Sequence, residues 1–226
     1  MLEIKDIYKT FNKGTINEKR ALQGVSLTLN DGDFVTVIGG NGAGKSTMLN
    51  AVAGTYTVDA GSILIDGVDV TRLPEHKRAK FIGRVFQDPM MGTAPTMQIE
   101  ENLALAARRG KRRGLGWGIN AKERARYREE LKKFDLGLED RLTKTAAKVL
   151  ELSDRIVEEN GLTTMMVTHN MRDAIAHGNR LIMLYNGRIV VDIAGDAKKN
   201  ITVPELLELF NKASGSDEAD DKLLLS

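Results

Sequence analysis

The stretch GGNGAGKST at residues 39–47 decides the fold of this chain. It follows the spacing G-x-x-x-x-G-K-[ST], with Gly39, Gly44, Lys45 and Ser46 at the fixed positions. Glycine suits such a loop because successive backbone N–H groups must face inward, where side chains would block a phosphate. Lys45 supplies a compact positive charge for the β- and γ-phosphates, and the Ser46 hydroxyl is a ligand for Mg²⁺. The stretch therefore predicts binding of a nucleoside triphosphate.

The residues on both sides of this loop support the same interpretation. Residues 34–38 (FVTVI) form a short apolar run typical of a strand, and residues 46–53 (STMLNAVA) are typical of a helix. The loop then ends at a helix N-terminus, which attracts anions. We expect the nucleotide to contact the whole loop: Gly39, Gly40, Asn41, Gly42, Ala43, Gly44, Lys45, Ser46 and Thr47.

Length and composition indicate one large domain, or a domain with a subdomain. The chain has 226 residues, and its 33 basic and 31 acidic residues leave a net charge of only +2, so no global field for nucleic acid or lipid is expected. There is no cysteine, which excludes disulfides and thiolate chemistry. No apolar run approaches the roughly 20 residues that cross a bilayer, and the first residues lack a signal-peptide core. We expect a cytoplasmic protein that reaches a membrane only through a partner.

The hydrophobic pattern predicts an α/β fold. Strands are expected at residues 2–7, 22–29, 34–38, 62–65, 163–168, 180–185 and 188–193, with hairpin turns at Asp66-Gly67 and Asn186-Gly187. Residues 78–87 are expected to lead through another apolar strand into a loop. Helices are expected at residues 144–160 and 171–177 and from Pro204 onward, and residues 98–141 are helical and basic in composition.

Three short segments then occur in an order that resembles the ATP-binding subunits of ABC transporters, of the importer type. They are the loop at 39–47, VFQDP at 85–89 and MMVTHN at 165–170, and the likeness extends from residue 1 to about residue 210. The resemblance implies a P-loop NTPase fold with a parallel core sheet, an N-terminal antiparallel β subdomain and a helical subdomain. It places an ATP-binding domain at 1–212, with a truncated helical subdomain at about 90–143. Residues 213–226 are expected to be an acidic, disordered tail.

The resemblance also implies roles for single residues, with ATP and Mg²⁺ as cofactors. Phe11 resembles the aromatic residue that stacks on adenine, although Tyr8 is an alternative. Gln87 resembles the glutamine that contacts Mg²⁺ and the attacking water, so Ser46 and Gln87 are the expected metal ligands. His169 resembles the switch histidine that contacts the γ-phosphate. Gln87 and His169 are therefore the expected catalytic residues.

Two motifs of the same family are absent. Hydrolysis needs an apolar strand that ends in Asp-Glu, where Asp holds Mg²⁺ and Glu orients or deprotonates water. No such run occurs in the chain, and neither does the Ser-Gly-Gly-Gln signature that opens a helix. Residues 141–143 resemble the approach to the signature, whereas residues 144–147 resemble the helix after the catalytic strand. We therefore infer an excision of about 30–40 residues near Thr143 and Lys144.

The expected partners are transmembrane permease subunits, a second copy of the chain and, in the same system, a substrate-binding protein. The flanking sequences favour uptake of an amino acid or a related small solute. RRGKRR at residues 108–113 is expected to be a solvated face, with a permease or anionic lipid as the next interpretation. Nucleic-acid binding is a minor alternative, since few aromatic residues accompany these charges. An ABC ATPase acting on nucleic acid or ribosomes and a non-catalytic nucleotide-binding remnant remain as alternative functions.

Overall fold

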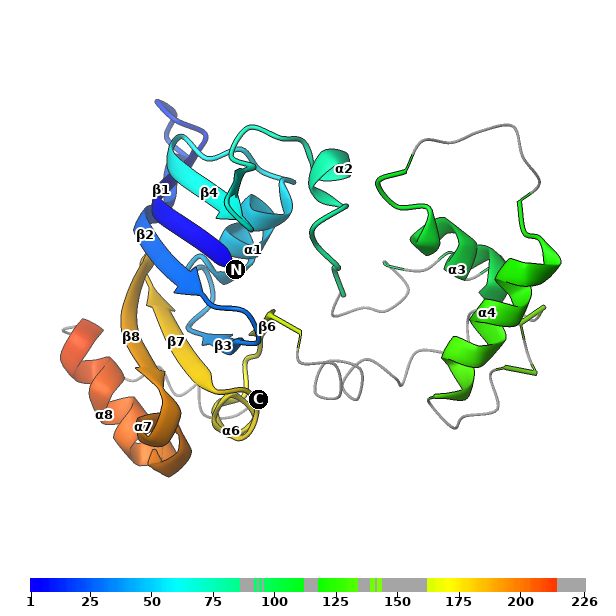
Figure 1. Cartoon of the computed structure of the whole chain (residues 1–226). Helices are drawn as coiled ribbons and strands as arrows, with labels where there is room; N and C mark the ends of the chain where they lie inside the picture. The colour runs from blue at the N-terminus through cyan, green and yellow to red at the C-terminus, as the bar shows by residue number, and fades with distance from the viewer. Residues whose placement is uncertain are drawn as a thin grey trace. The chain divides into compact units, whose positions relative to one another are not determined.

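The computed structural model of the protein describes residues 1–85, 92, 94, 96–111, 118–133, 139–140, 142–143 and 162–214. The chain divides into two compact units (Figure 1). Unit 1 comprises Met1–Glu75 and Val157–Ser226, and unit 2 comprises His76–Ile156. Several sequence predictions lie outside the described residues, namely Gln87, the helix at 144–160 and residues 215–226 of the predicted tail. The prediction of a disordered tail is wrong for residues 213 and 214, which are the last two residues of a helix.

Unit 1 begins with an antiparallel sheet in the order β2-β1-β4-β5. Its strands are β1 (Leu2–Phe11), β2 (Lys19–Leu29), β4 (Ala60–Ile65) and β5 (Val68–Asp69). Asp66 and Gly67 both have positive φ, as a two-residue hairpin turn requires, which confirms the turn predicted there. Strand β1 is longer than the predicted 2–7, and Phe11 is its last residue, opposite Lys19 of β2.

The second sheet of unit 1 has the order β6-β3-β7-β8. Its strands are β3 (Phe34–Ile38), β6 (Thr164–Val167), β7 (Arg180–Tyr185) and β8 (Arg188–Ala194). β3 pairs in parallel with both β6 and β7, while β8 returns antiparallel to β7. β3 is buried along most of its length, which explains its continuous apolar sequence. These bounds confirm the strands predicted around the phosphate loop and in the last third of the chain.

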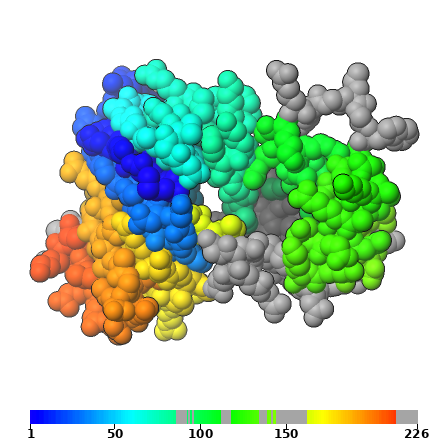
Figure 2. All heavy atoms as spheres, viewed as in Figure 1, coloured from blue at the N-terminus to red at the C-terminus, as the bar shows by residue number. Residues whose placement is uncertain are grey.

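Unit 1 has four described helices, of which the first contacts β2 and the other three contact this second sheet. They are α1 (Lys45–Ala53), α6 (Met171–Ala176), α7 (Gly195–Asn200) and α8 (Val203–Ser214). Met171 and Ala174 of α6 pack with Leu206 and Phe210 of α8 and with Leu181 in one buried cluster. The other side of α8 belongs to the surface of the unit (Figures 1 and 2). No helix within the described ranges is long and apolar enough to span a membrane.

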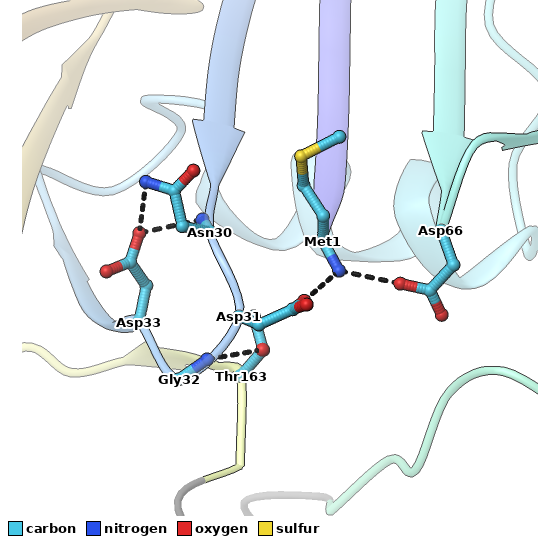
Figure 3. A network of polar contacts seen from close by, with 7 residues as sticks. All are labelled: Met1, Asn30, Asp31, Gly32, Asp33, Asp66 and Thr163. Carbon is cyan, nitrogen blue, oxygen red and sulfur yellow. Dashed lines mark hydrogen bonds and ion pairs between the residues drawn. The ribbon is translucent and has the colours of Figure 1, made fainter.

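A network of polar contacts fixes the turns beside β6 (Figure 3). The α-amino group of Met1 pairs with Asp31 and Asp66, so the first residue connects the β2–β3 turn with the β4–β5 turn. The pKa of this amino group is raised, chiefly by its hydrogen bond with Asp31. In the same β2–β3 turn, the Gly32 N–H donates to the Thr163 hydroxyl at 3.0 Å. The start of β6 is thereby attached to the turn that precedes β3.

The described helices of unit 2 are α2 (Glu75–Arg78, shared with the end of unit 1), α3 (Ile99–Ala107) and α4 (Ala121–Lys132). Ile99 and Ala104 of α3 pack with Tyr127 and Leu131 of α4. Both helices begin with a capping box in which the third helical residue is a glutamate. The structure therefore confirms helices within the predicted range 98–141, at Ile99–Ala107 and Ala121–Lys132, whereas the described residues 108–111 and 118–120 are not helical.

The strand predicted within residues 78–87 is wrong for residues 78–85, which the structure describes. The N–H groups of Phe81 and Ile82 donate to the Arg78 carbonyl at 2.9 and 3.2 Å, so helical turns occupy the first part of this segment. Residues 82–85 join no ladder of the described strands, and Val85 is 71% exposed. A strand needs a neighbour to pair its backbone, and the described residues supply none here.

Candidate phosphate-binding site

The loop between β3 and α1 depends on glycine at two of its positions. Gly39 has φ +146°, and a Cβ there would lie 2.2 Å from the Leu184 carbonyl oxygen of β7. Gly44 has φ +109°, and its Cβ would lie 2.6 Å from the Ala21 carbonyl oxygen of β2. In contrast, a Cβ on Gly40 would meet nothing within 4 Å. The loop is therefore held close to the backbones of β7 and β2 while its middle stays open.

Lys45 is the buried cation of this loop. The residue is only 6% exposed, and its Nζ donates to the carbonyl oxygens of Gly39 at 2.5 Å and Gly40 at 3.0 Å. Burial lowers the pKa of the Lys45 ammonium below its ordinary value. An anion placed at this loop would counteract the cost of burial, because it favours the charged form of the lysine.

The start of α1 adds an electrostatic attraction for anions. Gly44 is the N-cap residue, no side chain caps the helix, and the first turn carries no acidic residue. The first N–H groups of a helix have no partner inside the helix, so those at the start of α1 are donors for phosphate oxygens. Ser46 is exposed in this turn and Thr47 is half-buried, so neither residue is enclosed in the core.

His169 follows β6 at the carboxyl end of the second sheet, and the phosphate loop follows β3 at the same end. Val37 lies opposite Val167 in the parallel β3–β6 pair, and the chain continues from these residues to Gly39 and to His169. The exposed His169 lies between Thr168, whose hydroxyl accepts a hydrogen bond from the Asn170 N–H, and Asn170, whose side chain caps α6. Ligands of parallel sheets bind at the carboxyl ends of the strands, and both His169 and the loop follow such an end.

Phe11 lies at the end of β1 beside two other side chains. Its ring contacts Tyr56 edge to face, with ring centroids 5.2 Å apart, and the Lys9 ammonium is 5.5 Å from its centre. Tyr8 is the alternative aromatic residue, but its hydroxyl lies against Gly24, 2.9 Å from where a Cβ on that glycine would be. Of the two residues, Phe11 is the one opposite Lys19, and this lysine reaches the phosphate loop.

Lys19 is the residue of this site that sequence analysis missed. Its Nζ lies 3.1 Å from the position that a Cβ on Gly42 would take, so its ammonium faces the middle of the loop. A lysine at the start of a strand carries no motif. Only the pairing of β1 with β2 and the fold of the loop bring it there, so no signal in the sequence marks it.

The described residues fit phosphate better than they fit a metal ion. Two lysines, a helix N-terminus and an open glycine loop suit a polyphosphate. For Mg²⁺ the site offers the Ser46 hydroxyl, whereas no group of three or more His, Asp or Glu side chains with a metal-binding arrangement occurs among the described residues. Gln87, the second expected metal ligand, lies outside those residues. Mg²⁺ would thus depend mainly on the phosphates and water for its ligands.

Comparison with known proteins identifies relatives across most of the chain. The sequence profile of the ABC transporter family matches residues 22–176. The tyrosine transport ATP-binding protein of Clostridioides difficile is 36% identical, with 94% of this chain and 100% of the relative covered. The spermidine/putrescine import ATP-binding protein PotA of Haemophilus influenzae is 28% identical. That alignment covers 85% of this chain and 57% of the relative.

Solved structures show the same fold. A nucleotide-free ATP-binding cassette from an ABC transporter superimposes with a TM-score of 0.70 at 22% identity, covering 93% of this chain and 98% of that chain. A dimeric cassette in a post-hydrolysis state with ADP and Pi gives 0.62 at 24% identity, with coverage of 86% and 98%. The two sheets and their helices are therefore those of a P-loop cassette.

The alignment with the tyrosine relative also measures what this chain lacks. It runs over 256 residues, whereas the aligned 94% of the 226 residues is about 212, so about 44 aligned positions have no residue in this chain. That total is close to the 30–40 residues inferred from the absent motifs. The place of the gap, near Thr143 and Lys144, stays a prediction.

Proposed function

Since this chain belongs to the ABC transporter family of ATP-binding proteins, we propose that it is the nucleotide-binding subunit of an importer for a small, amine-bearing solute. The observation that carries this proposal is the loop at 39–47 at the carboxyl edge of β3, with Lys45 held inside it. The solute class is supported by the names of two relatives, which serve tyrosine and spermidine or putrescine. All three compounds carry amino groups.

In this proposal each residue at or near the phosphate loop has a separate role. The amide groups of residues 39–47 and the ammonium of Lys45 bind the phosphates, and the Ser46 hydroxyl orients toward Mg²⁺. Phe11 stacks on the base. His169 contacts the terminal phosphate from the end of β6, and Gln87 senses the metal and the water. Mg·ATP, once bound, would supply the negative charge that the Lys45 ammonium and the amide groups of the loop attract.

We further propose that the chain binds ATP without hydrolysing it at an appreciable rate. The chain contains no Asp-Glu pair after an apolar strand, so no carboxylate of that motif can hold the metal or activate water. Strand β6 lies at the edge of the described sheet, and all four of its residues are partly exposed. This supports the loss of a strand that would otherwise cover β6 on that side.

The partners follow from the same family membership. We propose that the chain attaches to a transmembrane permease on the inner face of the cell membrane and that two nucleotide-binding subunits act together, with a substrate-binding protein delivering the solute. A dimeric relative supports the second part. The missing signature helix would weaken closure of the dimer, because each subunit normally presents that helix to the nucleotide of the other.

Co-purification from native membranes tests the proposed function. A tagged chain, produced in its own cells and extracted in mild detergent, is expected to retain a permease with several membrane spans. Because this chain is not expected to hydrolyse ATP, the solute is identified by testing the co-purified complex for binding of labelled tyrosine and putrescine. Retention of nucleic acid at moderate salt, with no membrane protein and no bound solute, would contradict the proposal.

A further inference from the structure

Lys19 places a second ammonium group at the phosphate loop, opposite the open side of Gly42. Gly42 is exposed, has φ +80°, and lies 3.1 Å, measured from its missing Cβ, from the Lys19 Nζ. Lys19 itself is exposed at the first position of β2, directly opposite Phe11. Its position is fixed by the β1–β2 ladder, which does not belong to the phosphate motif.

The charged neighbours of Lys19 in the sequence, Glu18 and Arg20, pair with each other and not with Lys19. Glu18 accepts a hydrogen bond from the Gly14 N–H at 2.8 Å and pairs with Arg20 at 3.6 Å. The Gly14 hydrogen bond is the main reason that the pKa of Glu18 lies below its ordinary value, with Arg20 contributing less. The Lys19 ammonium instead lies beside Gly42. No ion pair of Lys19 is found within the described ranges.

The start of α1 adds no acidic side chain to the two ammonium groups at this loop. Lys45 lies inside the loop, Lys19 lies outside it at Gly42, and the first turn of α1 between them has no acidic residue. An anion seated on the loop would therefore be near two ammonium groups, one from helix α1 and one from strand β2. With Lys45 alone, the polyphosphate oxygens on the solvent side would be hydrated and would contact no ammonium group.

We propose that Lys19 is a second phosphate-binding cation of this site and contacts the polyphosphate of the bound nucleotide from the solvent side. This inference rests on the proposed nucleotide-binding function and adds a positioning residue to it. Because Lys19 is exposed, its contribution is modest and salt-dependent. Replacing it is expected to weaken binding about three- to tenfold.

The test uses the whole chain with Mg·ATP and, separately, with magnesium tripolyphosphate, which has no base or ribose. Lys19→Gln should weaken both ligands by a similar factor, Lys19→Arg should largely restore both, and 0.5 M salt should shrink the difference. The matched control is Lys5→Gln, since Lys5 is an exposed lysine of β1 that pairs with Glu3. This control should bind like the parent chain.

Three results would overturn the proposal. Unchanged affinity in Lys19→Gln would show that the ammonium does not contact the ligand. A loss for ATP alone, with tripolyphosphate unaffected, would place Lys19 at the base or ribose. A parent chain that binds neither ligand would refute the proposed function itself, and this inference with it. Equal thermal unfolding of Lys19→Gln and Lys5→Gln confirms that the comparison concerns binding, because both side chains are exposed.

Discussion

Val37 of β3 and Val167 of β6 lie side by side in a parallel ladder, and the Thr168 N–H donates to the Val37 carbonyl oxygen at 3.2 Å. This pairing brings the phosphate loop and His169 to the same end of the sheet, where β3 and β6 both reach their carboxyl ends. On its other side β6 has no partner strand among the described residues. The same strand thus leads to His169 at its end and has an open side among the described strands.

Restoring the missing segment should restore hydrolysis. We expect a chain to release phosphate from Mg·ATP when a segment that carries an apolar strand ending in Asp-Glu and a Ser-Gly-Gly-Gln helix start is inserted between Thr143 and Lys144. The chain without the insert should release none above background. Amide hydrogen exchange in β6 should slow in the inserted chain, since a new strand pairs its open edge. Phosphate release by the chain without the insert, at the rate of the inserted chain, would contradict this prediction.

Gly39 and Gly40 should respond differently to the same substitution. Gly39→Ala forces a Cβ to within 2.2 Å of a backbone oxygen of β7 at a φ of +146°, and should cost more than about 2 kcal/mol of unfolding free energy. Gly40→Ala meets nothing within 4 Å and is the matched control, with an expected change of less than about 0.5 kcal/mol. Denaturant unfolding measures both. Equal losses would show that the loop does not pack on β7 as described.

Phe11→Ala should weaken ATP but not tripolyphosphate. Stacking of a base on an aromatic ring is worth about 1–3 kcal/mol, so the loss for ATP should be about 5- to 150-fold. GTP should lose a similar factor, because stacking does not read the edges of the base. Tyr8→Ala is the control, since the Tyr8 hydroxyl lies against Gly24. A larger loss in Tyr8→Ala than in Phe11→Ala would reverse the assignment.

The ion pair between Glu100 and Arg124 should make unit 2 sensitive to acid. Arg124 donates two hydrogen bonds to the buried Glu100, at 2.6 and 2.7 Å, and these bonds are the main reason that the pKa of Glu100 lies below its ordinary value of 4.5. The pair therefore stabilises the unit fully above pH 4.5, and this contribution is lost as the pH falls through the lowered pKa.

Arg124→Met tests this pH dependence. In the variant, burial alone acts on Glu100 and raises its pKa, so the variant should be less stable than the parent at pH 7. The difference should shrink as the pH falls below 4.5. Hydrogen exchange in Ile99–Ala107 of α3 reports this locally. A stability difference that stays constant from pH 7 to pH 3.5 would show that the ion pair has no such role.

Much of unit 1 could be predicted from sequence because its signals are local. The loop at 39–47 lies between a continuous apolar strand and a helix, and Asp66-Gly67 and Asn186-Gly187 form the hairpin turns that their residue types favour. The parallel ladders could not be derived from residue pattern alone. The resemblance supplied a parallel core sheet, but the register that brings His169 beside the loop came from the structure.

The errors of prediction have physical causes. Residues 82–85 have an apolar pattern that suits a strand, yet a strand exists only where a neighbour pairs its backbone. Lys19 escaped notice because its role depends on contacts between β2 and the loop after β3. Helix α7 was not predicted, and its buried Lys198, which donates to the carbonyl oxygens of Ile175 and Gly178 at the end of α6, has no local signature.

The central claim is that the loop around Lys45 binds a nucleoside triphosphate in this chain. Calorimetric titration with Mg·ATP tests this claim most directly. The parent chain should give heat that saturates at one nucleotide per chain. Lys45→Met should give none, because the variant lacks the cation that now hydrogen-bonds Gly39 and Gly40. No heat from the parent chain, or the same binding curve from Lys45→Met, would contradict the account.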